Sequence, residues 1–108
     1  MIDWAHVDEL RNDMGDSFDE IVEVFLQEVE DALARLDPDA GAEAMAADLH
    51  FLKGAALNLG FSEFASLCAS GEARANRGET AGIDPGRIRQ AYTVSRHDFL
   101  DGLQRRAA

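Results

Sequence analysis

Apolar residues recur every three or four positions through most of this chain, with polar residues between them. This spacing lines up the apolar side chains along one side of an α-helix, whereas a half-buried strand shows strict alternation of apolar and polar residues. No segment shows that alternation. The pattern therefore predicts an all-α protein built from amphipathic helices.

Start and stop signals divide the chain into one short helix followed by longer ones. We expect Asp3 to cap the short helix and Gly15 to end it. Ser17 to Glu20 has the sequence of a capping box, so a second helix should run from there to about Leu36, where Asp37-Pro38 breaks it. The apolar side of the short helix comprises Trp4, Val7, Leu10 and Met14.

A third helix is predicted from about Ala40 to Leu59, with Gly60 as its stop signal. Its apolar residues recur at alternating steps of four and three, which is typical of a helix in a bundle. We therefore expect this helix to contribute one continuous buried seam. The seam comprises Met45, Leu49, Leu52, Ala56 and Leu59.

A fourth helix is predicted from about Ser62 to Arg77, followed by a loop over 78–82. Asp84-Pro85 then combines a capping acid with a proline suited to the first helical position, so a last helix should begin there. Short connections between long amphipathic helices imply antiparallel neighbours. The sequence thus predicts a single domain, 1–108, folded as an antiparallel up-and-down four-helix bundle with a short additional N-terminal helix.

Charge and cysteine content narrow the function. The net charge is −11, with 21 acidic residues against 10 basic ones, which argues against binding to nucleic acid or to an anionic membrane. The one cysteine, Cys68, cannot form an internal disulfide, so we expect a cytoplasmic protein. The preference for arginine over lysine, with many alanines and glycines, suggests a bacterial genome rich in G and C.

The only lysine of the chain, Lys53, follows His50 by three residues and directly precedes Gly54. Successive helix residues turn by about 100°, so His50 should point roughly 140° away from the buried seam and Lys53 about 80° away. Gly54 should point about 180° away. His50 is therefore predicted to be exposed, with an ammonium group one turn along the same helix.

The predicted neighbours of His50 on its helix face are small or apolar, and none is acidic. A glycine inside a helix costs about 1 kcal/mol relative to alanine, so Gly54 suggests close approach by another molecule. This face has the character of a docking platform around a reactive imidazole. It comprises Ala46, Ala47, Gly54 and Leu57.

An imidazole nucleophile beside an ammonium group suits a phosphoryl group, which the nitrogen can carry and the cation can stabilise. The run from His50 to Gly60 resembles the signature of histidine-containing phosphotransfer (HPt) domains, His-x-x-Lys-Gly followed by small residues and a glycine. The amphipathic second helix with its central phenylalanine also resembles the family, as does the pattern of leucine and small residues in the fourth helix. The resemblance therefore covers nearly the whole chain.

The resemblance implies a monomeric bundle that carries phosphoryl groups between receiver-domain aspartates, or from a sensor or hybrid histidine kinase to a receiver. His50 would be phosphorylated, Lys53 would stabilise the phosphoryl group, and Gly54 would admit the receiver. Glu72, at the family's polar position on the fourth helix, would orient the imidazole. Such a carrier is not an enzyme by itself; it needs no cofactor, and magnesium belongs to the partner receiver.

Gly71 departs from the family, which usually carries a bulky apolar residue at that position, and it is expected to weaken the fourth helix. His6 and His97 are interpreted as structural or incidental, and Cys68 as a core residue. No metal site is predicted, because a metal-carboxylate bundle would need Glu-x-x-His pairs on two helices.

Three alternatives remain. The bundle could bind a receiver or a kinase without taking phosphate, as an adaptor or inhibitor. It could be a domain of a larger chemotaxis or hybrid kinase, although the starting methionine and the arginine-rich tail favour a free-standing protein. An acidic mimic of nucleic acid would need one continuous acidic stripe, whereas the acids here are spread over several predicted helices.

Overall fold

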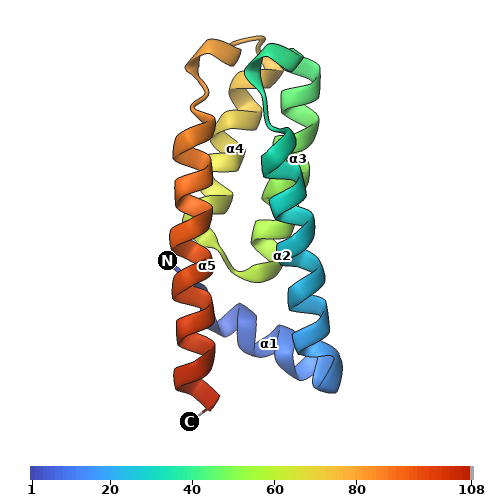
Figure 1. Cartoon of the computed structure of the whole chain (residues 1–108), viewed down its shortest axis with the longest axis vertical. Coiled ribbons are helices and arrows are strands. Elements are labelled where there is room, and N and C mark those ends of the chain that lie inside the picture. Colours follow the sequence, from blue (N-terminus) through green and yellow to red (C-terminus); the bar gives the residue numbers. More distant parts are fainter. Residues whose placement is uncertain (108) are drawn as a thin grey trace.

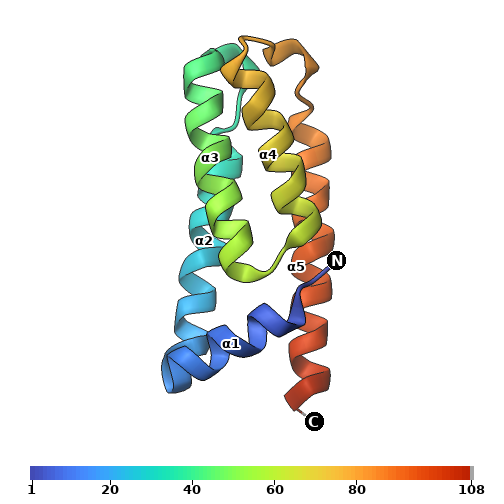
Figure 2. The ribbon, with the colours of Figure 1, turned by 180° about the vertical axis from the view of Figure 1, so that it is seen from behind.

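The computed structural model describes residues 1–107, which form an elongated bundle of 46 × 20 × 20 Å. Four long helices run along the long axis, and the short first helix lies across one end of the bundle (Figures 1 and 2). The predicted all-α architecture is confirmed, and the only β-type pairing in the described residues is an isolated bridge between Ile2 and Phe61. The helices are α1 (Trp4–Met14), α2 (Phe18–Arg35), α3 (Ala42–Leu59), α4 (Ser62–Asn76) and α5 (Pro85–Ala107).

One core runs along the axis of the bundle. The seam predicted for α3 is fully buried, because it meets the apolar sides of the other long helices. Burial of these side chains is the main favourable contribution to folding. The largest fully buried side chains are those of Phe61, Phe64, Phe99, Met45, Leu49, Leu52 and Leu59.

The N-terminal segment holds the turn between α3 and α4 in place. The backbone N–H of Asp3 donates to the Gly60 carbonyl at 2.8 Å, and that of Ser62 donates to the Met1 carbonyl at 3.2 Å. The Asp3 side chain caps α1 by accepting from the His6 backbone N–H, as predicted. The His6 ring lies 2.8 Å from the Asn58 carbonyl, which gives this histidine the structural role expected of it.

Two details at the ends of α1 and α2 differ from the prediction. Ser17 makes no capping hydrogen bond, because the chain enters α2 through a single turn of 3-10 helix over Gly15–Ser17 and Ser17 keeps a helical backbone. The capping-box prediction is therefore wrong. Met14 is exposed, because it lies on the last turn of α1, whose fully buried residue is Val7.

Gly71 has a packing function that the sequence did not reveal. It is buried within α4, and a Cβ atom placed on it would lie 3.0 Å from Cδ1 of Leu49, which is fully buried in α3. The α4 helix continues through this position to Asn76. The glycine therefore allows α3 and α4 to approach closely, and the expected weakening of the fourth helix does not interrupt it.

Substitution of Gly71 with valine is expected to lower the free energy of unfolding by about 1–3 kcal/mol, because the side chain would overlap Leu49 in a filled core. Urea unfolding followed by circular dichroism measures this change. Ala73→Val, at an exposed position of the same helix, is the control for the lower helix propensity of valine. Equal losses in the two variants would contradict the close approach at Gly71.

Candidate functional site

The candidate site lies on α3, away from the core. The His50 side chain is 69% exposed, as the helical wheel predicts. Gly54, one turn further along, is also exposed, and a Cβ atom there would have no neighbour within 4 Å. The surface of α3 next to the imidazole is therefore open to another molecule.

A carboxylate from α4 connects the histidine to the lysine. Oε2 of Glu72 lies 2.8 Å from Nδ1 of His50, and Oε1 of the same carboxylate accepts a hydrogen bond from Nζ of Lys53 at 2.6 Å. Glu72 is mostly covered, with 16% of its side chain exposed, and Lys53 is partly covered. Glu72 thus contacts both residues of the His-x-x-Lys pair, each through its own oxygen.

This arrangement fixes the chemistry of the imidazole. A carboxylate ion only accepts hydrogen bonds, so the proton of the neutral ring lies on Nδ1 and the lone pair on Nε2. The hydrogen bond from Lys53, followed by that from His50, lowers the pKa of Glu72 below its ordinary value, and burial opposes this shift. Glu72 is therefore ionised at neutral pH, and Nε2 of the exposed imidazole is the ring nitrogen that makes no hydrogen bond within residues 1–107.

The lowered pKa of Glu72 gives a pH-dependent contribution to stability. Because the pKa is lower in the folded state, this contribution is complete above the unfolded pKa of about 4.3 and is lost as the pH falls through the folded value. The difference in urea midpoint between wild type and Glu72→Gln should be constant near neutral pH and shrink under acid. If the difference in urea midpoint grew below a pH of about 4, the lowered pKa of Glu72 in the folded state would be contradicted.

A hollow of about 310 Å³ lies beside His50, between α2 and α3. Phe51 and Leu57, on the same helix as His50, are 41% and 57% exposed. The sequence alone gave no sign that Phe51 is exposed, because an isolated phenylalanine in a helix is usually buried. Apart from His50, the hollow is lined by Phe25, Glu28, Phe51, Gly54, Ala55 and Asn58.

The predicted docking face needs two corrections. Ala47 and Leu57 are exposed, but Ala46 is partly buried and packs against the core, because its direction lies nearer to the seam of α3. The surroundings of His50 are also not free of acids. Glu72 reaches the imidazole from α4, and Glu28 borders the hollow from α2. The wheel of a single helix could not reveal either carboxylate, since both come from neighbouring helices.

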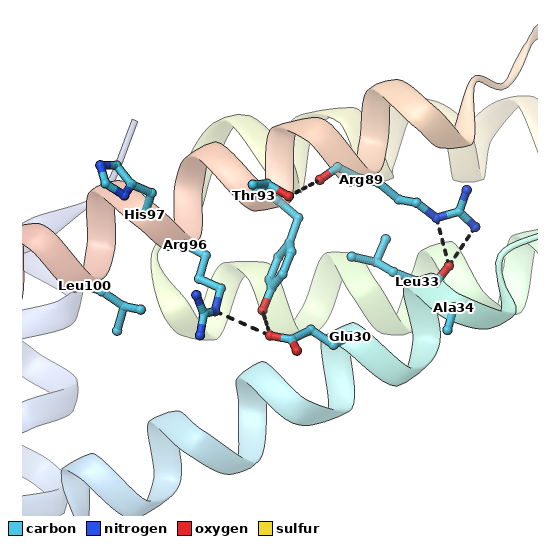
Figure 3. Close-up of a pocket in the computed structure, with 9 residues that line it drawn as sticks. Glu30, Leu33, Ala34, Arg89, Thr93, Arg96, His97 and Leu100 are labelled. Carbon is cyan, nitrogen blue, oxygen red and sulfur yellow. Dashed lines mark hydrogen bonds and ion pairs between the residues drawn. The ribbon is translucent and has the colours of Figure 1, made fainter.

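A larger hollow, of about 770 Å³, lies between α2 and α5 (Figure 3). Its polar groups bind one another. The Tyr92 hydroxyl donates to Glu30 at 2.7 Å. Arg96 pairs with the same carboxylate at 3.4 Å, and Arg89 donates to the Leu33 carbonyl (Figure 3). Burial and the neighbouring Glu30 raise the pKa of Tyr92. These long side chains connect α2 to α5, and none of them is arranged as a nucleophile.

Neither His97 nor Cys68 contacts His50 or lines the hollow beside it. His97 borders the hollow between α2 and α5, and Cys68 is fully buried. Burial raises the pKa of the Cys68 thiol to about 12, which leaves it protonated and unreactive. Among residues 1–107, no three side chains of His, Cys, Asp or Glu gather closely enough to hold a metal ion.

Comparison with known families decides the classification. A family model of the Hpt domain matches residues 20–104. The chain belongs to the Hpt domain family. Curated proteins and solved structures gave no match. At the level of the family, Hpt domains carry phosphoryl groups on histidine in phosphorelays, and they interact with receiver domains and histidine kinases.

No helix in the described part of the chain has the length and apolar character needed to span a bilayer.

Proposed function

We propose that this Hpt domain accepts a phosphoryl group on Nε2 of His50 from a phosphorylated receiver domain or a histidine kinase, and passes it to an aspartate of a receiver domain. The observation that carries this proposal is the contact of Nδ1 with Glu72 while the rest of the imidazole is exposed. We further propose that the protein acts as a monomer in the bacterial cytoplasm.

In the accepting step, the lone pair of Nε2 attacks the phosphorus of a phosphoaspartate in line. An N–P bond forms, the O–P bond breaks, and the electron pair leaves on the aspartate carboxylate. The imidazole ring gains positive charge, which Glu72 stabilises through Nδ1. In the donating step, a receiver carboxylate attacks the phosphorus, and the electron pair of the N–P bond returns to Nε2.

Lys53 would stabilise the transferred group. One donor of its ammonium group bonds to Glu72, and the remaining donors are available to phosphoryl oxygens. Glu72 contacts the Nδ1 side of the ring, so a phosphoryl group on Nε2 would lie beyond the ring from this carboxylate. Ala47, Gly54 and Leu57 would contact the partner. The partner receiver would supply magnesium, and this chain would need no cofactor or ATP site of its own.

Transfer of label tests the proposal directly. The protein is mixed with ³²P-labelled receiver domains and, separately, with an autophosphorylated sensor kinase. Label that appears on this chain, and that acid removes while base does not, is the expected result for phosphohistidine. Binding to receivers or kinases without any label would overturn the proposal and leave the adaptor as the function.

Gly54→Leu is expected to block the approach of a receiver protein while His50 can still be phosphorylated by a small donor. Nothing lies within 4 Å of a Cβ at this position, so the variant should fold and gain about 0.5–1 kcal/mol in free energy of unfolding. Transfer from a receiver should fall by about tenfold or more, because the side chain would stand between the two proteins. Labelling by phosphoramidate, a small donor, should remain. Equal loss with both donors would contradict the access function.

A further inference from the structure

The hollow beside His50 combines apolar walls with one carboxylate. Phe25 from α2 and Phe51 from α3 provide the aromatic surface, and Glu28 lies on the α2 side. A volume of about 310 Å³ is ample for one large apolar side chain of a docked protein. Such a side chain would bring its neighbours on the partner close to Glu28.

Glu28 has no counter-charge of its own in the described residues. Its side chain is exposed and makes no hydrogen bond or ion pair within residues 1–107. The cations of α2 and α3 already have partners, since Lys53 binds Glu72 at 2.6 Å and Arg35 pairs with Asp48 at 3.8 Å. Arg96 of α5 lines another hollow together with Glu28, but it pairs with Glu30 at 3.4 Å. The carboxylate of Glu28 therefore adds to the negative potential of a chain with net charge −11.

A partner that covers this hollow removes water from around Glu28. Desolvation of an unpaired carboxylate opposes binding, whereas a lysine or arginine placed against it offsets that cost and speeds association. A partner with an acid at that position would be rejected by like-charge repulsion. One carboxylate beside the reactive histidine can thus favour partners with a basic residue at that position over partners with an acidic one.

We propose that Glu28 is a specificity-determining residue, which pairs with a lysine or arginine on the docking face of a receiver domain whose apolar side chain enters the hollow beside His50. The inference rests on the proposed phosphotransfer function and names the chemistry of its partner. The receiver surface over α2 is accordingly apolar at its centre and basic at its edge.

The test uses the receiver domain that exchanges phosphoryl groups fastest with wild type in the labelling experiment. Its transfer kcat/KM is measured for wild type, Glu28→Gln, Glu28→Lys and the control Asp98→Lys. Asp98 is exposed on α5 and, like Glu28, has no ion-pair partner within residues 1–107. Labelling by phosphoramidate and urea unfolding show that each variant keeps its fold and its reactive His50.

At low salt, Glu28→Lys should lower kcat/KM about tenfold and Glu28→Gln about threefold, whereas Asp98→Lys should have little effect. The losses should shrink at an ionic strength of about 1 M, where the Debye length is about 3 Å. When the lysine or arginine of the receiver that faces Glu28 is replaced by glutamate, this receiver variant should again transfer phosphoryl groups to the Glu28→Lys variant. Equal rates for Glu28→Lys and Asp98→Lys would overturn this inference alone, whereas no transfer by wild type would overturn the proposed function with it.

Discussion

Replacement of His50 by glutamine is expected to abolish labelling of this chain by every phosphodonor. Glutamine keeps a polar side chain of similar reach, but its amide nitrogen has no lone pair available for attack on phosphorus. Because His50 is exposed on α3, the fold should be unaffected, and the urea midpoint should change little. Autoradiography after mixing with labelled receiver or kinase measures the effect.

His97→Gln is the matched control, because His97 is also an exposed histidine on a long helix. This variant should be labelled like wild type, since His97 has no ion pair with a carboxylate in the described residues and lies beside the hollow between α2 and α5. Residual acid-labile label on His50→Gln, or its loss from His97→Gln, would refute the assignment of the reactive residue.

Helical periodicity was sufficient to predict much of the fold and part of the site. The seam of α3 fixed the orientation of that helix, and the positions of His50 and Gly54 followed from the angle between successive residues. These features depend on one helix alone. The position opposite the histidine was indicated by resemblance to the Hpt family, and the structure places the Glu72 carboxylate against the imidazole there.

The features that the sequence did not reveal depend on two helices at once. Glu28 borders the hollow because α2 packs beside α3, and no spacing within α2 indicates which of its acids faces His50. Gly71 looked like a weakness of α4, whereas it is the point where Leu49 of α3 approaches. Ser17 matched a capping motif, but the local backbone adopted a 3-10 turn instead.

The close packing at Gly71 lies next to the candidate site. Gly71 directly precedes Glu72, and Leu49 directly precedes His50. Gly71 packs against Leu49, and the residues that follow them, Glu72 and His50, form the 2.8 Å contact. The glycine that departs from the family pattern thus directly precedes the residue that contacts the imidazole.

The second large effect is expected from Phe61, at the turn between α3 and α4. Its side chain is fully buried, with ring centroids 5.3 Å from Phe99 and 6.3 Å from Tyr92, both on α5. Phe61→Ala should lower the free energy of unfolding by about 3–5 kcal/mol, because it leaves a cavity that its neighbours only partly fill. That loss is a large fraction of the roughly 5–15 kcal/mol typical of a domain.

Phe51→Ala is the matched comparison, because it removes an equal side chain from an exposed position beside His50. Urea unfolding should show a fall in midpoint of about 2 M for Phe61→Ala, taking a slope of about 2 kcal/mol/M, and little change for Phe51→Ala. Transfer from a receiver should show the opposite order at temperatures where both variants are folded, since Phe51 lines the hollow where we propose that the receiver docks and Phe61 only supports the fold. Similar midpoints for the two variants would contradict the buried role of Phe61, and unchanged transfer by Phe51→Ala would remove the hollow from the docking surface.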